Sequence, residues 1–409
     1  MLRARFVNAA PVRVCLAYSG GLDTSVILAW LIEKGHTVVA FLADVGQNED
    51  YNVVKAKAEK IGAECMIIQD LQQELVEELV WPAVQCNAVY KDAYLLGTSL
   101  ARPVIARAMM KVAKQYNCEF LSHGCTGNGN DQVRFEMAWR ALDQRTKTII
   151  PWRVPEFCER FAGRQALLDF AESKGVPVTS TKQKPFSMDT NLIHCSYEAG
   201  LLEQPELEPP ADMWTMTVDP MKAPDEPTRF TVHFEKGIPI KLEAANEIGR
   251  ATGVGRVDIV ESRFIGLKSR GCYDTPGLTI LRTAHRDLEG LVMDSKVRAI
   301  RDQMVTSNWT ACLYNGMYFS PERAFLHDSI IFSQRHVEGK VNMVAYKGSA
   351  FVVGRSSETS NLYSETESSM DTLDGFSPMD TSGHIAIQAI RLEKYGARKT
   401  RDGEPLAPI

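Results

Sequence analysis

The stretch VRVCLAYSGGLDTSVILAWLIEKG, residues 12–35, contains three signals from which the fold is predicted. It opens with a nearly continuous apolar run, which is typical of a buried β-strand. Two glycines follow, and the remainder has the apolar spacing and the length of a helix. A strand that ends in a glycine turn and leads into a helix is the beginning of a β–α repeat.

Residues 36–124 repeat this order of strand and helix. Strands are expected at 37–46, 64–71 and 118–124, and helices at 49–62, 72–84 and 104–117. Strands with both faces buried that alternate with helices predict a parallel sheet flanked by helices. Ligands of such sheets bind beyond the carboxyl ends of the strands. Three loops leave these ends, at residues 19–23, 43–48 and 123–131.

The alternation stops near residue 165. GRQALLDFAESKGVPV (163–178) predicts a last helix–strand pair, and the remaining pattern is that of an α+β domain. Its expected elements are strands at 213–218 and 228–234, one long helix at 279–305, a hairpin with a Lys-Gly turn at 341–356 and a helix at 383–400. The predicted organisation is a flexible N-terminus (1–11), an α/β domain (12–172), a second domain (173–375) and a C-terminal helix with its tail (376–409).

The composition limits the class of protein. The chain has 409 residues, of which 44% are hydrophobic and 24% charged, as in globular proteins of two or three domains. Its formal net charge of −5 argues against nucleic acid or an anionic membrane as partners. Nine dispersed cysteines form no zinc-type cluster and suit reduced thiols, so no metal site is expected. No apolar run approaches the ~20 residues of a membrane span. The sequence predicts a soluble intracellular protein.

The glycine loop (AYSGGLDTS, residues 17–25) carries the strongest chemical signal. Its glycines let the backbone approach a ligand closely, and its serines and threonine add hydroxyl donors. Backbone N–H groups at a helix N-terminus, together with the helix dipole, favour phosphate. The loop is neither a Walker A motif nor GxGxxG. Two glycines alone fit plain helix entry equally well, but the strand, the helix and the hydroxyls together favour phosphate binding.

SGGLDTS also resembles the pyrophosphate loop of the N-type ATP pyrophosphatases, which split ATP into AMP and pyrophosphate. Further segments resemble the argininosuccinate synthase family and occur in that family's order. They are LLGTSLARP (95–103), SHGCTGNGNDQVRFE (122–136), IPWRVPEF (150–157), FSMDTNLIHCSYEAG (186–200), GVGRVDIVESRFIGLKSRGCYDTP (253–276) and VEGKV (337–341). The glycine loop alone is typical only of the superfamily, whereas six long motifs in order over residues 12–395 are highly specific.

The resemblance implies an ATP-dependent condensation of L-citrulline with L-aspartate, which yields argininosuccinate, AMP and pyrophosphate in arginine biosynthesis and the urea cycle. It implies ATP as a substrate with Mg²⁺. It further implies an ATP-binding domain like the adenine nucleotide alpha hydrolases, an α+β synthetase domain, and a C-terminal oligomerisation helix in a cytoplasmic homotetramer.

Matching the family motifs residue by residue implies three sets of contacts. The implied ATP-binding residues are Ala17, Tyr18, Ser19, Gly20, Gly21, Leu22, Asp23, Thr24, Ser25, Ala43 and Gly124. The implied citrulline-binding residues are Tyr94, Ser99, Asn130, Arg134, Ser187, Ser196, Glu261 and Tyr273. The implied aspartate-binding residues are Thr126, Asn130 and Asp131.

Charge suggests how the two amino acids are held. On the resemblance, Asp131 pairs with the ammonium of aspartate, while Thr126 and Asn130 hold its carboxylates. The planar fork of Arg134 suits the citrulline carboxylate, and Glu261 suits its ammonium. Without the resemblance, a helix cap is favoured for Asp131, a surface ion pair for Arg134 and a solvated charge for Glu261.

The implied chemistry follows from the leaving group. The ureido group of citrulline would have to expel oxide, whereas transfer of AMP to its oxygen makes AMP the leaving group. The amine of aspartate then attacks citrullyl-AMP. Backbone donors of the glycine loop and Mg²⁺ would stabilise the charge on the phosphates. Asp131 and the pyrophosphate both remain open as acceptors of the proton from the amine.

The chain departs from the family pattern after residue 242. AANEIGRAT (244–252) follows almost directly, so roughly a dozen residues that other members carry are absent. Two alternatives therefore stay open, another pyrophosphate-loop adenylating synthetase and a catalytically silent paralogue. The acidic balance and the lack of paired cysteine ligands argue against a tRNA-thiolating enzyme, and the lack of a glutaminase region argues against an amide-forming one.

Overall fold

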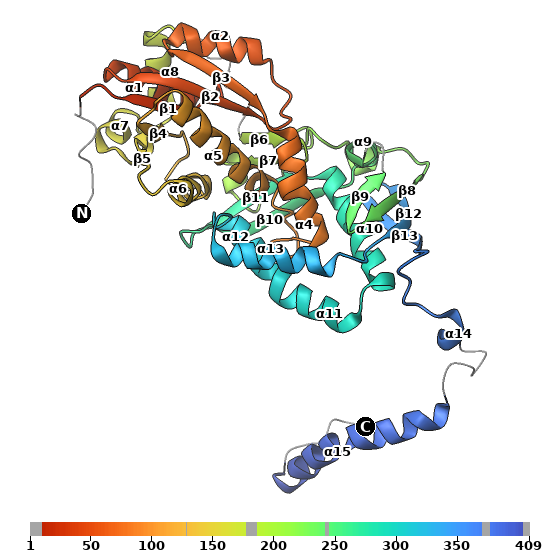
Figure 1. Ribbon diagram of the computed structural model, residues 1–409. Helices are drawn as coiled ribbons and strands as arrows, with labels where there is room; N and C mark the ends of the chain where they lie inside the picture. The colour runs from red at the N-terminus through yellow and green to blue at the C-terminus, as the bar shows by residue number, and fades with distance from the viewer. Residues whose placement is uncertain (1–9, 128, 177–185, 242–244, 370–376, 404–409) are drawn as a thin grey trace. The chain divides into compact units, whose positions relative to one another are not determined.

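A computed structural model describes residues 10–127, 129–176, 186–241, 245–369 and 377–403 (Figure 1). The chain divides into two compact units, Met1–Ser360 and Asn361–Ile409. The described part of the larger unit contains one parallel and two antiparallel sheets.

The parallel sheet has the strand order β3-β2-β1-β4-β5. Its strands are β1 Arg13–Ala17, β2 Thr37–Asp44, β3 Cys65–Asp70, β4 Phe120–Ser122 and β5 Lys147–Thr148. All four strand pairs are parallel. The expected α/β architecture is confirmed, with β1 at the centre and the glycine loop at its carboxyl end.

Helices cover both faces of this sheet. Side chains alternate along a strand, so Cys15 packs into the core formed with α5, whereas Val14 and Leu16 pack into the core formed with α1. The helices of this half are α1 Leu22–Glu33, α2 Tyr51–Ile61, α3 Gln72–Leu75, the π-helical η1 Val76–Val80, α4 Trp81–Gln85, α5 Gly97–Gln115, α6 Asp131–Leu142, the 3₁₀ turn η2 Pro151–Arg153, α7 Pro155–Arg160 and α8 Arg164–Ser173.

Helix α2 is fixed at both ends by its sequence. The Asp50 carboxylate accepts from the N–H groups of Asn52 and Val53, which would otherwise lack partners. At the other end Gly62 has a φ of 114°, a left-handed conformation that glycine adopts without strain. The helix therefore starts and stops where these two residues stand.

The second half of the larger unit contains two four-stranded antiparallel sheets, in the orders β10-β11-β7-β6 and β13-β12-β8-β9. The strands are β6 Ser187–Asn191, β7 His194–Glu198, β8 Thr228–Glu235, β9 Ile238–Lys241, β10 Arg256–Ser262, β11 Lys268–Asp274, β12 Gly339–Tyr346 and β13 Ser349–Ser356. The helical segments are η3 Gly200–Glu203, η4 Pro220–Lys222, α9 Ala245–Thr252, α10 Pro276–Val292, α11 Ser295–Ile300, η5 Arg301–Thr306, α12 Ser307–Tyr314 and α13 Pro321–Ser333.

The structure tests several of the helices and strands that were predicted for this half. The hairpin of β12 and β13 is confirmed, and its turn is formed by Lys347 and Gly348 with φ angles of 40° and 86°. The single helix expected at 279–305 is wrong, because α10 ends at Val292 and Asp294 caps a new helix through the N–H groups of Lys296 and Val297. The strand expected at 213–218 is absent from the described strands. The strand expected near residue 178 lies outside the described residues.

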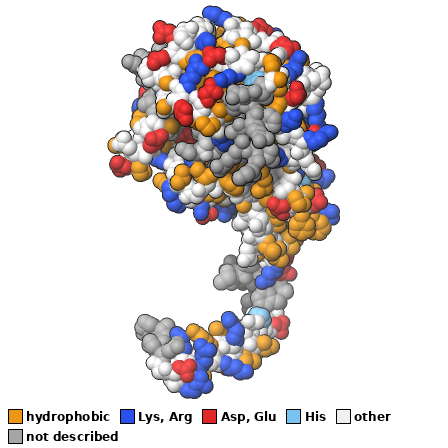
Figure 2. Space-filling model, turned by 90° about the vertical axis from the view of Figure 1, so that its left-hand side faces the viewer, with side chains coloured by type: hydrophobic (Ala, Val, Ile, Leu, Met, Phe, Trp, Pro, Cys, Tyr) orange, Lys and Arg blue, Asp and Glu red, His pale blue; other side chains and the backbone are white. Residues whose placement is uncertain are grey.

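The smaller unit contains α14 Glu365–Ser368 and α15 Pro378–Arg401. Helix α15 confirms the expected C-terminal helix, and its N-cap Ser377 accepts from Met379 N. Hydrophobic and basic side chains are both visible on it in Figure 2. Ile385 and Ile387 are 63% and 68% exposed. Within the part of the chain that the structure describes, no helix is long and apolar enough to cross a membrane.

Candidate active site

The glycine loop closes the carboxyl end of β1 and opens α1. Gly20 has a φ of 75°, and Gly21 is the N-cap of α1 in an extended conformation. No side chain caps this helix, so its first N–H groups are left without a side-chain acceptor, as an anion site at this loop would require. The hydroxyls stand around the turn: Ser19 Oγ lies 3.1 Å from Thr24 Oγ1, and Ser25 Oγ donates to Gly20 O at 3.4 Å.

The two other residues expected to contact ATP lie at neighbouring loops. Ala43 is at the end of β2, next to β1 in the sheet, and its carbonyl accepts from Gln47 Nε2 at 2.7 Å. Gly124 follows β4, which flanks β1 on the other side. A Cβ on Gly124 would lie 2.8 Å from Cγ2 of Thr24, so the loop after β4 packs directly against the first turn of α1.

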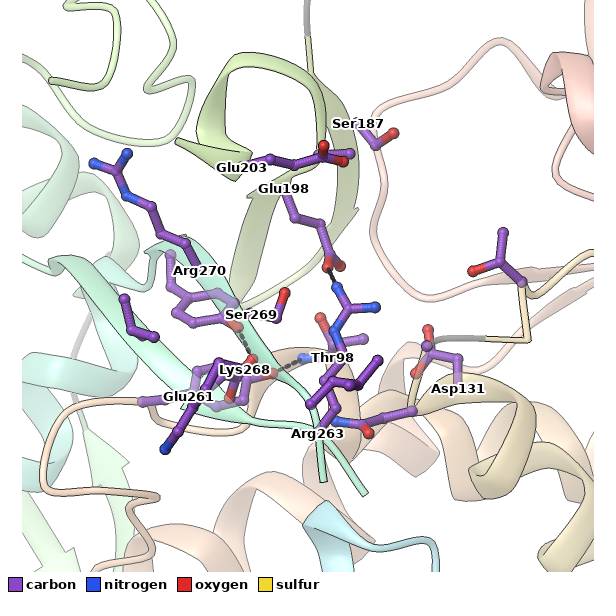
Figure 3. A pocket seen from close by; sticks show the side chains of 18 of the residues that line it. Thr98, Asp131, Ser187, Glu198, Glu203, Glu261, Arg263, Lys268, Ser269 and Arg270 are labelled. Carbon is purple, nitrogen blue, oxygen red and sulfur yellow. Dashed lines mark hydrogen bonds and ion pairs between the residues drawn. The ribbon is translucent and has the colours of Figure 1, made fainter. Parts of the chain in front are cut away.

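The same loop lines a cavity of about 780 Å³ in the larger unit. One wall is formed by Cys125, Thr126 and the start of α6, and the opposite wall by the hairpin of β10 and β11. Figure 3 shows Glu198 and Arg263 pointing toward one another, with Asp131 to one side and Ser187 beyond Glu198. The ion pair of Glu198 with Arg263 measures 2.9 Å. Burial raises the pKa of Glu198.

Asp131 is surrounded by positive charge. Arg102 Nη2 lies 2.7 Å from its Oδ2, and Arg134 Nη1 lies 2.8 Å from its Oδ1. Burial by itself raises the pKa of Asp131, but the two guanidinium groups outweigh it and hold the pKa well below its usual range. Arg102 also pairs with Asp189 on β6, so this cluster ties α5 and α6 to the second half of the chain. Asp131 makes no side-chain cap of α6.

Glu261 organises the aromatic side of the cavity. It is 8% exposed and accepts from the hydroxyls of Tyr273 at 2.5 Å and Tyr314 at 3.0 Å. Tyr94 stacks on Tyr273 with ring centroids 4.0 Å apart, and burial raises the pKa of Tyr94 to about 12. Burial also raises the pKa values of Tyr273 and Tyr314. These tyrosines therefore stay protonated at neutral pH, and Tyr273 and Tyr314 position the carboxylate by donating to it.

Arg134 and Asn130 already have partners in the protein. Nε and Nη2 of Arg134 donate to the carbonyl of Tyr314 at 3.1 and 3.0 Å, so one side of its fork binds backbone. Asn130 Oδ1 accepts from Phe264 N at 2.8 Å, at the tip of the β10–β11 hairpin. The hairpin is thereby attached to the loop after β4 through a residue predicted to bind both amino acids.

The residues predicted to bind citrulline or aspartate fall into two groups. Those that line the cavity are Tyr94, Thr126, Asn130, Asp131, Arg134, Ser187, Glu261 and Tyr273. Ser99 and Ser196 are buried behind its wall. Within the described part of the chain Ser99 Oγ has no hydrogen-bond partner, and Ser196 Oγ donates to the carbonyl of Asp189 at 3.5 Å.

Sequence reasoning missed several lining residues. Glu198 and Arg263 lie inside family-like motifs but carry no pattern that distinguishes them from surface charges. Tyr314 lies outside every motif, and only its apolar helix could have marked it as buried. Thr98 lines the cavity and lies 3.2 Å from Nε2 of His194, whose pKa burial lowers to about 3.

Comparison with known proteins agrees with this arrangement. A family model described as the arginosuccinate synthase N-terminal HUP domain matches residues 13–177, and one described as the arginosuccinate synthase C-terminal domain matches residues 186–395. The chain belongs to the argininosuccinate synthase family. The argininosuccinate synthase of Saccharomyces cerevisiae is 55% identical over 414 residues, which covers 96% of this chain and 99% of the yeast protein.

Other argininosuccinate synthases match over a similar extent. That of Schizosaccharomyces pombe is 56% identical over 394 residues, covering 93% of this chain and 96% of its own. That of Danio rerio is 48% identical over 398 residues, covering 93% of this chain and 96% of its own. Membership of the argininosuccinate synthase family makes the chain an ATP-binding ligase that forms a carbon–nitrogen bond in arginine biosynthesis, and the alternative functions are not favoured.

Proposed function

We propose that this protein condenses L-citrulline with L-aspartate, using ATP, to give argininosuccinate, AMP and pyrophosphate. One observation carries the proposal beyond family membership. The loop after β4 touches the first turn of α1 through Gly124 and lines the charged cavity through Thr126 and Asp131. A nucleotide at the glycine loop and amino acids in the cavity would therefore meet across a few residues.

The proposed first step is attack of the ureido oxygen of citrulline on the α-phosphorus of ATP, which breaks the bond to pyrophosphate and forms citrullyl-AMP. The uncapped N–H groups of α1 and the hydroxyls of Ser19, Thr24 and Ser25 would bind the phosphates, together with Ala17, Tyr18, Gly20, Gly21, Leu22 and Asp23. Ala43 and Gly124 would flank the nucleotide from the strands on either side of β1.

The second step is attack of the aspartate amine on the activated carbon, with AMP leaving. We propose that Thr126, Asn130 and Asp131 bind aspartate. Tyr94, Ser99, Asn130, Arg134, Ser187, Ser196, Glu261 and Tyr273 would bind citrulline. The lowered pKa of Asp131 makes its carboxylate a weak base at neutral pH. This favours pyrophosphate, of the two acceptors left open, as the group that takes the proton from the amine.

Mg²⁺ is proposed to enter with ATP as the magnesium complex. Among the described residues, no group of three or more His, Cys, Asp or Glu side chains is arranged to hold a metal ion. Mg²⁺ commonly binds through substrate phosphates with few protein ligands, so this mode suits a site built from N–H groups and hydroxyls.

We further propose a cytoplasmic homotetramer that takes small-molecule substrates and no nucleic acid. The proposed parts remain an N-terminal segment (1–11), of which residues 1–9 lie outside the described residues, an ATP-binding domain (12–172), a synthetase domain (173–375) and an oligomerisation segment (376–409). The exposed apolar side chains of α15 support self-association, because a helix gains little stability until such a stripe is covered.

The shortened segment is compatible with the proposed activity. Part of it, residues 242–244, lies outside the described residues. Helix α9 after it is anchored to the β6–β7 turn and to the start of α10, since Asn246 Nδ2 donates to Leu192 O at 2.8 Å and Asn246 Oδ1 accepts from Gly277 N at 3.0 Å. Glu261 follows in the next strand with both of its tyrosine partners in place.

The test is release of pyrophosphate from ATP with citrulline and aspartate each omitted in turn. Release that requires citrulline, together with argininosuccinate formation that requires both, is the expected result. Citrulline labelled with ¹⁸O in its ureido group should transfer the label to AMP. Pyrophosphate release with a different acceptor, or label in any other product, would overturn the proposed reaction.

A further inference from the structure

Helix α2 brings a lysine into contact with the glycine loop. Lys57 Nζ donates to the carbonyl of Gly20 at 2.6 Å, across 37 residues of sequence. The same carbonyl accepts from Ser25 Oγ at 3.4 Å. Two donors thus hold the Gly20 carbonyl at the point where the chain takes its left-handed turn.

The packing of α2 fixes this lysine in place. Val54 and Lys57 are three residues apart and therefore share one face of the helix. A Cβ on Gly20 would lie 3.0 Å from Cγ1 of Val54, so this face lies directly on the loop. Tyr51 and Ile61 on the same helix pack against the core beneath the sheet. Lys57 therefore stands on a helix that is capped at both ends, and this helix holds its ammonium against the glycine loop.

Among the described residues, Lys57 is a cation without an anion. Its side chain is half-buried, and in the part of the chain that the structure describes no carboxylate lies within 4.0 Å of its ammonium. Burial lowers the pKa of Lys57, because the charged form loses hydration that nothing charged replaces. An ammonium has three N–H donors, and Gly20 takes one of them.

We propose that Lys57 is an additional nucleotide-binding residue, which holds the Gly20 carbonyl in place and donates its remaining N–H groups to the polyphosphate of ATP and to pyrophosphate as it departs. This inference rests on the proposed role of the glycine loop. A charge-assisted bond in a partly desolvated loop is stronger than the neutral bonds that the hydroxyls supply.

The test compares Lys57→Met with Lys55→Met, a matched control two residues away on the exposed face of the same helix. Lys57→Met should raise the KM for ATP about tenfold or more and weaken competitive inhibition by inorganic pyrophosphate to a similar extent. The KM values for citrulline and aspartate should stay within about twofold, and the melting temperature should not change. Lys57→Arg, which keeps the charge, should recover most of the ATP affinity.

Two results would overturn the inference. One is an ATP KM and a pyrophosphate inhibition constant in Lys57→Met that match those of Lys55→Met. The other is an equal rise of all three KM values with a lower melting temperature, which would make Lys57 a purely structural residue. If Lys57→Met does not fold, Lys57→Gln is subjected to the same comparison. Failure of the unaltered protein to release pyrophosphate would instead refute the proposed reaction.

Discussion

Tyr314 connects the two charged centres of the cavity. The single hydrogen of its hydroxyl is shared between Glu261 Oε2 at 3.0 Å and the carbonyl of Ser262 at 2.9 Å, while its own carbonyl accepts from both Nε and Nη2 of Arg134. Its ring stacks on Tyr90 at 3.8 Å. One residue at the end of α12 thus orients the carboxylate and the guanidinium that are proposed to bind opposite ends of citrulline.

Replacing Tyr314 by Phe removes only the hydroxyl. We expect the KM for citrulline to rise about 5- to 20-fold, because Glu261 loses one of its two tyrosine donors, while the KM for ATP stays unchanged. Steady-state kinetics with each substrate varied measures this. Tyr363→Phe, at an exposed position in the smaller unit, is the control. A citrulline KM like that of the control would show that the hydroxyl is dispensable.

The limits of sequence reasoning are clear at these residues. Glu261 and Tyr273 stand in one motif and lie on two neighbouring strands, so a pattern could identify them together. Tyr314 is 53 residues from Glu261 and reaches it through the packing of α12 against the hairpin. Hydrogen bonds between distant segments leave no local pattern, which is also why Lys57 was missed.

At the scale of elements, the loop after β4 joins the nucleotide side to the amino-acid side. Its contact with α1 depends on the absence of a side chain at Gly124, where a Cβ would lie 2.8 Å from Cγ2 of Thr24. A Cβ on Gly127 in the same loop would have nothing within 4 Å among the described residues. The two glycines therefore differ in what a methyl group would displace.

Gly124→Ala should push the loop away from α1 and so raise the KM for ATP several-fold, since a contact under 3.0 Å forces one side to move. Gly127→Ala, the matched control, should leave the KM for ATP within about twofold of that of the unaltered protein. Isothermal titration with ATP, or steady-state kinetics, distinguishes them. Equal ATP affinities in the two variants would mean that the loop does not contribute to the nucleotide site.

A buried polar network holds helices of the second half to the end of α4. Glu289 on α10 is fully buried and accepts from both Nη atoms of Arg301 at 2.6 Å, from Asn87 Nδ2 at 2.7 Å and from Gln334 Nε2 at 2.9 Å. Burial raises the pKa of Glu289, but His285 and Arg301 outweigh it and lower the pKa to about 2. The charged form of the Glu289 carboxylate therefore stabilises the folded state.

Glu289→Gln should lower the free energy of unfolding at pH 7 by about 3 kcal/mol, because the buried Arg301 loses the carboxylate that accepts from both of its Nη atoms and keeps only the half-exposed Asp302, 2.8 Å from its Nε. The folded-state pKa lies below the ordinary value of 4.5, so the stabilisation is complete above pH 4.5 and is lost as the pH falls from there toward 2. Urea unfolding at several pH values measures the free energy of unfolding of the unaltered protein and of the variant. A difference that is constant across this range would contradict the assignment.

The elements that the sequence predicted best are those with strong local signals. The apolar runs and glycine turns of residues 12–124 identify β1 to β4 and their helices. The break between α10 and α11 was missed because Asp294 interrupts an otherwise continuous helical pattern, and a single cap outweighs that pattern only in its tertiary setting. The segment at 213–218 has strand-like composition, yet Met216 N and Thr217 N donate to the Asp274 carboxylate instead of to a neighbouring strand.

At the scale of the whole molecule, the two compact units differ in how they are stabilised. The larger unit has continuous buried cores, whereas α15 leaves Ile385, Ile387, Ile390 and Leu392 between 49% and 68% exposed. Such a helix needs a covering surface to be stable, and the proposed homotetramer would provide one.

Truncation after Ser360 should leave the larger unit folded but reduce the assembly from a tetramer to smaller species, as measured by analytical ultracentrifugation. Leu392→Lys should act in the same direction in the full chain, because a charge replaces an apolar contact. Glu393→Lys, at the adjacent position, is the control. Tetramers that persist after truncation would assign the association to the larger unit alone.

The position of Tyr314 along the chain also matters for biosynthesis. The parallel sheet is complete at Thr148, but the cavity beside it gains its last described lining residue only at Tyr314. At roughly 5–20 residues per second on the ribosome, synthesis of residues 149–314 takes about 8–33 s. Until Tyr314 has been synthesised, Arg134 lacks the carbonyl that orients its guanidinium and Glu261 lacks one of its hydroxyl partners, so the amino-acid side of the cavity is completed late.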